Sequence, residues 1–193
     1  MLNCIVTLFL GEDMAQQLKL FHIDMKYIRD LHKADDKVLS VSPQIGKSNR
    51  VFLGVFNVGN NRNYVIPLSH AEDKYNKLSS KADFEKIYDA KGRLVAVLRL
   101  NLMIPVEEAQ LIPVDLTIHQ TDSPQVKAYK NLCKNEIRYC KKIENAKRIS
   151  DKVLSLYDLC VNPKSKYKGK DRCVDFKKAE AVCDKYNKKH GNK

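Results

Sequence analysis

The spacing of apolar residues changes once along this 193-residue chain, and that change is the strongest constraint on its fold. Residues 18–118 contain short runs rich in β-branched and aromatic residues, separated by turn-forming residues. From Ser123 onward, apolar residues recur every three or four positions, which is typical of amphipathic helices. A series of strands followed by a series of helices predicts an α+β fold.

The first part of the chain is expected to form an antiparallel sheet. GNNR (59–62) and DAKG (89–92) are turn-type sequences that each separate two strand-like runs, which predicts two hairpins. Two later runs contain Pro, which restricts them to sheet edges. The expected elements are a strand at 18–23, a helix at 25–33, strands at 51–58, 63–68, 84–88 and 93–100, and edge segments at 103–105 and 112–116.

The second part is expected to be helical. Ser123-Pro124 is a typical helix start, because Ser caps the first turn and Pro fits its first position. Apolar periodicity predicts further helices at 147–159 and 174–189, with a basic loop at 162–172 between them.

Together these patterns predict one compact α+β domain. Its core would be a small antiparallel, barrel-like sheet formed by residues 18–118. Residues 123–189 would form a basic helical part packed around that sheet. A chain of this length buries about two-thirds of its surface around a single core.

The positive charge of the chain is concentrated in the helical part. Residues 126–193 contain 20 Lys and Arg against 8 Asp and Glu, whereas residues 1–125 contain 15 of each, so the last third carries the whole net charge of +12. This asymmetry indicates nucleic acid or an anionic membrane surface as partner, unless the helices simply present a solvated charged face. Tyr167 lies between Lys166 and Lys168 in the basic loop, so it is the best candidate for stacking on a nucleobase.

Several functional classes leave no signature in the sequence. The chain contains no phosphate-binding glycine loop, no dinucleotide fingerprint and no zinc-protease or serine-hydrolase motif, so we expect neither a cofactor nor a metal. No apolar run is long enough to span a membrane, and the first ten residues lack the pattern of a signal peptide. Six Cys without a C-x-x-C pair indicate reduced, buried thiols in a cytoplasmic protein.

One short segment combines several groups that catalyse proton transfer. PLSHAEDK (67–74) directly follows a predicted strand and contains the hydroxyl of Ser69, the imidazole of His70 and the ammonium of Lys74. Arg50 precedes the partner strand, so a hairpin would place Arg50 and Ser69 at the same open end of the ladder. The alternative is an ordinary turn with a helix N-cap, in which these residues have no catalytic role.

Several ordered segments resemble the ToxN/AbiQ family of bacterial type III toxin-antitoxin endoribonucleases. Their order and spacing match from about residue 19 to the C-terminus, nearly the whole chain. Residues 1–17 fall outside the match, and we interpret them as an N-terminal extension that is either non-native or disordered. The matching segments are KYI (26–28), DDKV (35–38), RVFLGV (50–55), YVIPLS (64–69), NLMIP (101–105) followed by EA (108–109), DL (115–116), YK (129–130) and CVDF (173–176).

This resemblance implies a fold and a function. The fold would be a compact α+β domain with a barrel-like core similar to the MazF and Kid toxins. The activity would be sequence-specific, metal-independent RNA cleavage by 2′-OH attack, leaving a 2′,3′-cyclic phosphate. The enzyme would be inhibited by a pseudoknotted antitoxin RNA, which it processes from a repeat transcript, within a closed toxin–RNA hetero-oligomer. Its substrate would be cellular or phage mRNA, and the biological outcome would be phage defence by abortive infection.

The resemblance and the residue chemistry together suggest roles at the site. Arg50 would stabilise the charge that develops on phosphorus, because a guanidinium binds two oxygens at once. Ser69 would hydrogen-bond the phosphate or the 2′-OH, and His70 would act as acid or base. His70 stands where the family often has a second hydroxyl and Glu72 where it has a lysine, so Lys74 would substitute for that lysine.

The RNA-binding surface is expected to combine lysines near the site with the basic loop. Two alternatives stay open beside the nuclease. One is a non-catalytic basic RNA-binding protein, which the charge and the tyrosines support equally well. The other is a protein that binds an anionic membrane or a structural partner through its charge. The expected RNA-binding residues are Lys37, Lys47, Lys166, Tyr167, Lys168 and Lys170.

Overall fold

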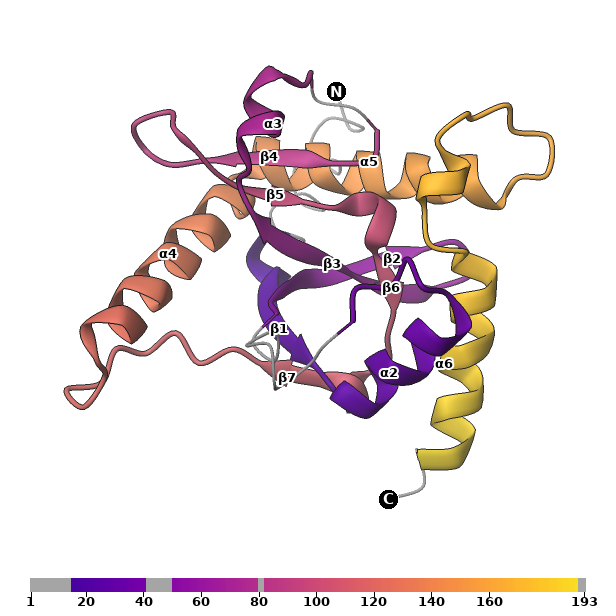
Figure 1. Cartoon of the computed structure of the whole chain (residues 1–193), viewed down its shortest axis with the longest axis horizontal. Coiled ribbons are helices and arrows are strands. Elements are labelled where there is room, and N and C mark those ends of the chain that lie inside the picture. The colour runs from indigo at the N-terminus through magenta and orange to yellow at the C-terminus, as the bar shows by residue number, and fades with distance from the viewer. Residues whose placement is uncertain (1–14, 41–49, 80–81, 191–193) are drawn as a thin grey trace, which may run out of the picture.

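Residues 15–40, 50–79 and 82–190 are described by the computed structural model of the chain (Figure 1). The strands and helices confirm the expected α+β fold. The strands are β1 (Lys19–Ile23), β2 (Phe52–Val58), β3 (Arg62–His70), β4 (Glu85–Tyr88), β5 (Leu94–Leu98), β6 (Ile104–Pro105) and β7 (Leu111–Pro113). The helices are α2 (Met25–Ala34), α3 (Asp73–Lys77), α4 (Pro124–Cys140), α5 (Ile143–Val161) and α6 (Phe176–His190), with short 3-10 turns η3 (Leu100–Leu102), η4 (Glu108–Gln110) and η5 (Lys170–Arg172).

All described strand pairs are antiparallel, and the strand order is β4-β5-β3-β2-β1-β7, with β6 also paired to β3. Both expected hairpins are present, β2–β3 and β4–β5. The two Pro-containing runs form the short strands β6 and β7, as expected. The long strand β3 therefore organises the sheet, because it pairs with three different strands.

The sheet does not close into a barrel, so that part of the expectation is wrong. Closure requires the two edge strands to meet, but among the described strands β4 pairs with β5 alone and β7 with β1 alone. The physical reason lies in β3, whose first residues pair with β2 and whose last residues pair with β5. The edges β4 and β7 therefore lie at opposite ends of the sheet (Figure 1). The likeness to MazF and Kid toxins stays a prediction.

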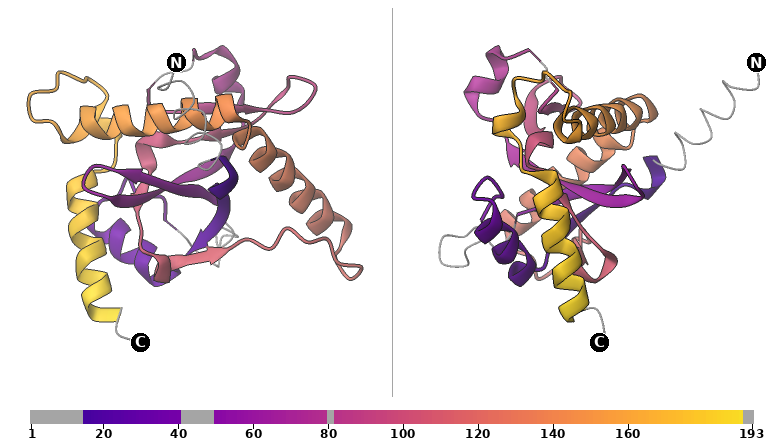
Figure 2. Two further views of the ribbon diagram at one scale, coloured as in Figure 1. Left: turned by 180° about the vertical axis from the view of Figure 1, so that it is seen from behind. Right: turned by 90° about the vertical axis from the view of Figure 1, so that its right-hand side faces the viewer.

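The helix start at Ser123 is confirmed. Oγ of Ser123 accepts a hydrogen bond from the backbone N–H of Val126 at 3.3 Å, and Pro124 occupies the first turn of α4. The N-terminal end of α4 projects beyond the sheet (Figures 1 and 2). Helix α5 begins at Ile143, earlier than expected, because its buried face already includes Ala146.

The helices α5 and α6 bury apolar side chains against the sheet. Helix α5 contacts β2 and η3, while α6 contacts β6 and lies beside α2 (Figure 2). The described strands and all three long helices contribute to one core, to which α5 adds Ile149, Val153 and Leu156 and α6 adds Phe176 and Ala179. Sheet and helices thus fold around a common interior, as one domain.

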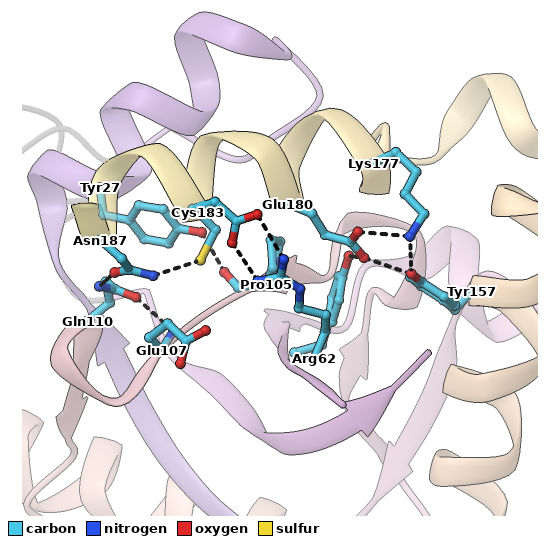
Figure 3. A network of polar contacts seen from close by, with 12 residues as sticks. Tyr27, Arg62, Pro105, Glu107, Gln110, Tyr157, Lys177, Glu180, Cys183 and Asn187 are labelled. Atoms are coloured by element: carbon cyan, nitrogen blue, oxygen red, sulfur yellow. Dashed lines mark hydrogen bonds and ion pairs between the residues drawn. The ribbon is translucent and has the colours of Figure 1, made fainter. Parts of the chain in front are cut away.

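Polar contacts fix α6 to the sheet as well (Figure 3). The buried carboxylate of Glu180 accepts hydrogen bonds from the hydroxyls of Tyr64 at 3.0 Å and Tyr157 at 2.7 Å, and Lys177 pairs with it at 2.9 Å. Burial raises the pKa of Glu180, but these three hydrogen bonds outweigh burial and lower it overall. The network compensates a charge that would otherwise be costly to bury.

Five described cysteines, Cys133, Cys140, Cys160, Cys173 and Cys183, are buried free thiols. Of the expected N-terminal extension, 1–17, residues 15–17 are described, and Ala15 is buried in the core. The remainder of that segment lies outside the described residues.

Candidate active site

A cavity of 570 Å³ lies where the end of β3 meets residues 50–51 and one face of α4. It is larger than the other two cavities described below, which measure 410 and 280 Å³. Its volume falls in the range that binds small organic groups. The lining residues are Arg50, Val51, Leu68, Ser69, His70, Gln125, Val126, Tyr129, Leu132, Cys133 and Glu136.

The expectation that Arg50 and Ser69 lie at the same end of the ladder is confirmed. The register pairs Phe52 with Pro67, and the backbone N–H of Leu68 donates to the carbonyl of Val51 at 2.9 Å. Continuing this register by two residues places Arg50 opposite Ser69, and both line the cavity. The hairpin therefore positions Arg50, just before β2, opposite Ser69 of β3, on the same face of the ladder.

Ser69 and His70 do not lie in a loop after the strand, which corrects the expected position. Both belong to β3, and they pair with Val97 and Ala96 of β5. The strand continues because β5 supplies a second ladder after β2 has ended, and that ladder satisfies the backbone groups of these residues. Ser69 is half-buried and His70 is exposed. Side chains of successive strand residues leave β3 on opposite faces, although Ser69 and His70 both line the cavity.

Arg50 is a partly buried cation that lacks an anionic partner among the described residues. Its Nε is buried and makes no hydrogen bond with any described residue. Burial lowers the pKa of Arg50, and the nearby positive charge of Arg99 lowers it further. The backbone carbonyl of Arg50 lies 3.0 Å from Nδ1 of His22, which holds this end of the segment against β1. Two guanidinium groups near one cavity create a positive potential that favours a phosphate.

The α4 wall of the cavity is one helical face. Its members Val126, Tyr129, Cys133 and Glu136 follow one another at spacings of three or four residues. Val126 remains 41% exposed although it belongs to the apolar stripe, because the stripe faces a cavity at this end instead of the core. Glu136 is 3% exposed, and burial raises the pKa of its carboxyl to about 7.

Our sequence reasoning missed two residues at this site. The signal for Glu136 is present in the sequence, since it is an acidic residue in phase with the apolar stripe of Tyr129 and Cys133. No local signal marks Arg99, whose charge reaches Arg50 because β5 pairs with β3.

Lys74 does not line the main cavity. It lies on α3, and its ammonium pairs with Glu72 at 2.7 Å, with both side chains exposed. It lines a second cavity of 280 Å³, together with Arg99 and Arg172. The structure therefore brings together three of the four expected catalytic residues, and Lys74 neighbours them through Arg99.

The expected RNA-binding residues are distributed over separate places. Lys37 is exposed and lines a polar cavity of 410 Å³ between the end of α2 and the start of α6. Lys166, Lys168 and Lys170 are exposed in the basic loop. Tyr167 is half-buried, and its ring lies so close to Gly169 that a side chain there would overlap it. Lys47 lies outside the described residues.

Within the described part of the chain, no helix is both long and apolar enough to cross a membrane.

Comparison with known proteins gives a consistent result. Residues 19–184 match the family model for the toxin ToxN of type III toxin-antitoxin systems. A protein from Bacillus thuringiensis subsp. kurstaki, named endoribonuclease ToxN, is 32% identical over 174 residues, which cover 88% of this chain and 84% of that protein.

Solved structures show the same similarity. One toxin, from work on its selective inhibition by a non-coding RNA pseudoknot, superposes with a TM-score of 0.72 at 29% identity, covering 88% of this chain and 98% of its own. AbiQ, a lactococcal anti-phage endoribonuclease of a type III system, superposes with a TM-score of 0.74 over 89% of this chain and 98% of its own. At 23% identity, AbiQ supports the fold alone.

Proposed function

This chain belongs to the ToxN family of toxins from type III toxin-antitoxin systems, and we propose that it is a sequence-specific endoribonuclease restrained by a small antitoxin RNA. The observation that supports this most directly is the cavity in which Arg50, Ser69 and His70 meet. The buried Nε of Arg50 has no partner among the described residues, as is typical of a cation that binds an anionic ligand.

In the proposed reaction, the ribose 2′-oxygen attacks the adjacent phosphorus and the bond from phosphorus to the 5′-oxygen breaks. The products are a 2′,3′-cyclic phosphate and a free 5′-hydroxyl. One proton leaves the 2′-hydroxyl and one reaches the 5′-oxygen. Arg50 stabilises the negative charge that develops on the phosphoryl oxygens, because a guanidinium donates two parallel hydrogen bonds.

The strand register suggests roles for Ser69 and His70 in this reaction. Ser69 lies opposite Arg50 on the same face of the ladder, so we assign it a hydrogen bond to the phosphate or the 2′-hydroxyl. His70 is exposed and approaches from the other face, so we assign it a proton transfer. RNA carries its own nucleophile and the guanidinium supplies positive charge, so we propose that cleavage needs no metal.

A path of basic residues supports an extended RNA ligand. The charge of Arg99 reaches Arg50 in the main cavity, and Arg99 lines the neighbouring cavity with Lys74 and Arg172. Arg172 ends the basic loop that carries the exposed lysines. We propose that the RNA backbone follows this path, with Lys74 binding a phosphate next to the one that is cleaved.

The antitoxin would occupy the same path. We propose that it is a pseudoknotted RNA whose 3′ end lies near Arg50 and Ser69, because the toxin cuts it from a repeat transcript and then keeps it bound. Toxin and RNA would form a closed hetero-oligomer in the cytoplasm. Free toxin would cut cellular or phage mRNA and so abort phage infection.

The cleavage assay uses purified protein, freed of bound RNA, incubated with a mixed-sequence transcript in EDTA. The expected result is a set of discrete cuts with 2′,3′-cyclic phosphate ends. Arg50→Ala and Ser69→Ala should each abolish detectable cutting. Arg93→Ala and Ser155→Ala are matched controls, since both residues are exposed and lie outside the cavity. Salt-sensitive binding without any cut would favour the non-catalytic RNA-binding protein. Cutting by folded Arg50→Ala and Ser69→Ala would contradict the site assignment.

The role of the basic loop in inhibition has its own test. Reversing the charge of Lys166, Lys168 and Lys170 together should weaken inhibition by the antitoxin more than it slows cutting. A control with the same change of net charge reverses the exposed lysines of α6. Equal antitoxin affinity in wild type and loop variant would contradict the proposal, as would an equal loss in both variants. The three control lysines are Lys185, Lys188 and Lys189.

A further inference from the structure

Glu136 differs from the other buried acids of the described chain. Three glutamates are buried there, Glu85, Glu136 and Glu180. Glu85 pairs with Arg148 at 2.9 Å and with Lys152, and Glu180 accepts hydrogen bonds from two tyrosines and from Lys177. Within the described residues, no hydrogen bond or ion pair reaches the carboxyl of Glu136.

A buried carboxyl that has neither a hydrogen bond nor an ion pair destabilises the fold, so its presence calls for a functional reason. Packing does not supply one, since Glu136 continues the stripe of Tyr129 and Cys133, where an apolar residue would fit. The carboxyl lines the cavity, together with the apolar side chains of Leu132 and Val126. The α4 wall therefore combines apolar side chains with a buried carboxyl that a ligand can satisfy.

We propose that the α4 face of this cavity is a nucleobase pocket, in which Glu136 binds the exocyclic amino group of the base next to the cleaved phosphate. This inference rests on the proposed function, because Arg50 and Ser69 would hold that phosphate at the opposite wall. The ring of the base would lie between apolar side chains of α4, with Tyr129 as the aromatic contact.

The chemistry of the bases makes this pocket selective. Adenine, cytosine and guanine each carry an amino group, and a carboxyl oxygen accepts a hydrogen bond from it. Uracil has carbonyl oxygens instead, and an oxygen facing the ionised carboxylate leaves both acceptors without a donor. With Glu136 ionised, the pocket should therefore reject uracil, by about 10- to 100-fold relative to a base that bears an amino group.

The protonation of Glu136 would decide among the three bases that carry an amino group. Burial raises the pKa of this carboxyl to about 7, so both forms are accessible near neutral pH. The ionised form accepts from two adjacent N–H groups, as guanine offers, while the protonated form also donates to a ring nitrogen of adenine or cytosine, or to a carbonyl oxygen of uracil. Tyr129, Cys133 and Cys140 of α4 interact electrostatically with Glu136. Arg50 and His70 line the same cavity.

The experiment measures base preference, which a purely structural role of Glu136 would not change. Short single-stranded RNAs that contain one mapped cut site are varied to each of the four bases at every position around it. Cutting rates and binding affinities are measured for wild type, Glu136→Ala and Glu136→Gln. Glu144→Ala removes an exposed acid of α5 and serves as the control.

At pH 8, where the carboxyl is mostly ionised, the wild type should reject uracil at one position next to the cut, and Glu136→Ala should lose that preference at this position alone. If the protonated carboxyl binds the base, Glu136→Gln should keep a preference for adenine or cytosine. If the ionised form binds it, Glu136→Gln should lose a preference for guanine. Equal base preference of wild type and folded Glu136→Ala at every position would overturn the pocket. If the wild type binds RNA without cutting it, the proposed nuclease activity is refuted. The binding affinities of the four base variants then still test whether Glu136 selects a base.

Discussion

Replacing Glu136 by glutamine is expected to remove a pH dependence from the folding stability of this protein. Glu136 is 3% exposed, and its carboxyl has no hydrogen-bond or ion-pair partner among the described residues. Burial therefore raises its pKa from 4.5 to about 7. Because the folded state holds this proton more tightly than the unfolded chain, stability is greatest below the unfolded pKa and falls as pH rises through the folded pKa.

The size of the effect follows from the two pKa values. A difference of one pKa unit is worth about 1.4 kcal/mol, so the full range from 4.5 to about 7 is worth about 3 kcal/mol. Between pH 5 and pH 8 the wild type should lose about 2.5 kcal/mol through this group alone. The glutamine variant carries no titrating group at this position, so it should be more stable than the wild type at pH 8.

Urea unfolding of both proteins at pH 5, 6, 7 and 8, free of RNA, measures this difference. The contributions of other titrating groups cancel when the unfolding free energy of the variant is subtracted from that of the wild type. Glu144→Gln is the control for an exposed acid, and its difference from the wild type should not change with pH. A difference of about 2.5 kcal/mol moves the unfolding midpoint by about 1 M urea. A wild-type-minus-variant difference that stays constant between pH 5 and pH 8 would refute the reasoning that Glu136 is buried without compensation.

Two further substitutions test the fold, each with a matched control. Gly59→Ala should destabilise by about 2–3 kcal/mol, because Gly59 has a φ of +53° and an added Cβ would lie 2.8 Å from an aromatic ring of α5. Gly92→Ala should cost only about 1 kcal/mol, since φ is +74° there but nothing lies within 4 Å; equal losses in thermal unfolding would contradict this contrast. Lys152→Ala should cost about 3 kcal/mol by leaving the buried carboxylate of Glu85 with less compensation. Lys147→Ala, which removes an exposed pair, should change stability by less than about 0.5 kcal/mol, and a chemical denaturation series compares the two.

Local sequence patterns predicted the types of the elements well. The helix at Pro124 starts where a Ser-Pro pair satisfies the first turn, and both hairpins form around turn-type sequences. These features depend on neighbouring residues, so a short window of sequence contains the information. The boundary of β3 was missed because it depends on β5, a strand more than twenty positions away.

The candidate site was predictable in part. Arg50 and Ser69 were placed together correctly, because a hairpin returns the chain beside itself and its register shifts by only one residue between Leu53 and Phe56. Lys74 was placed beside them on sequence proximity, but α3 carries it to a neighbouring cavity. Proximity along the chain does not set the direction in which a following helix leaves the strand.

By itself, the sequence determined that strands precede helices, that two hairpins form, and that the last third carries the positive charge. Periodicity and composition contain that information, because each depends on local residues. Only the tertiary structure decided that the sheet stays open and that α4 forms one wall of a cavity beside Arg50. It also decided that Glu136, the acid in phase with the apolar stripe of α4, lines that cavity without a hydrogen-bond or ion-pair partner among the described residues. The packing of α4 against the end of β3 joins residues far apart in the sequence, and no local pattern records such a contact.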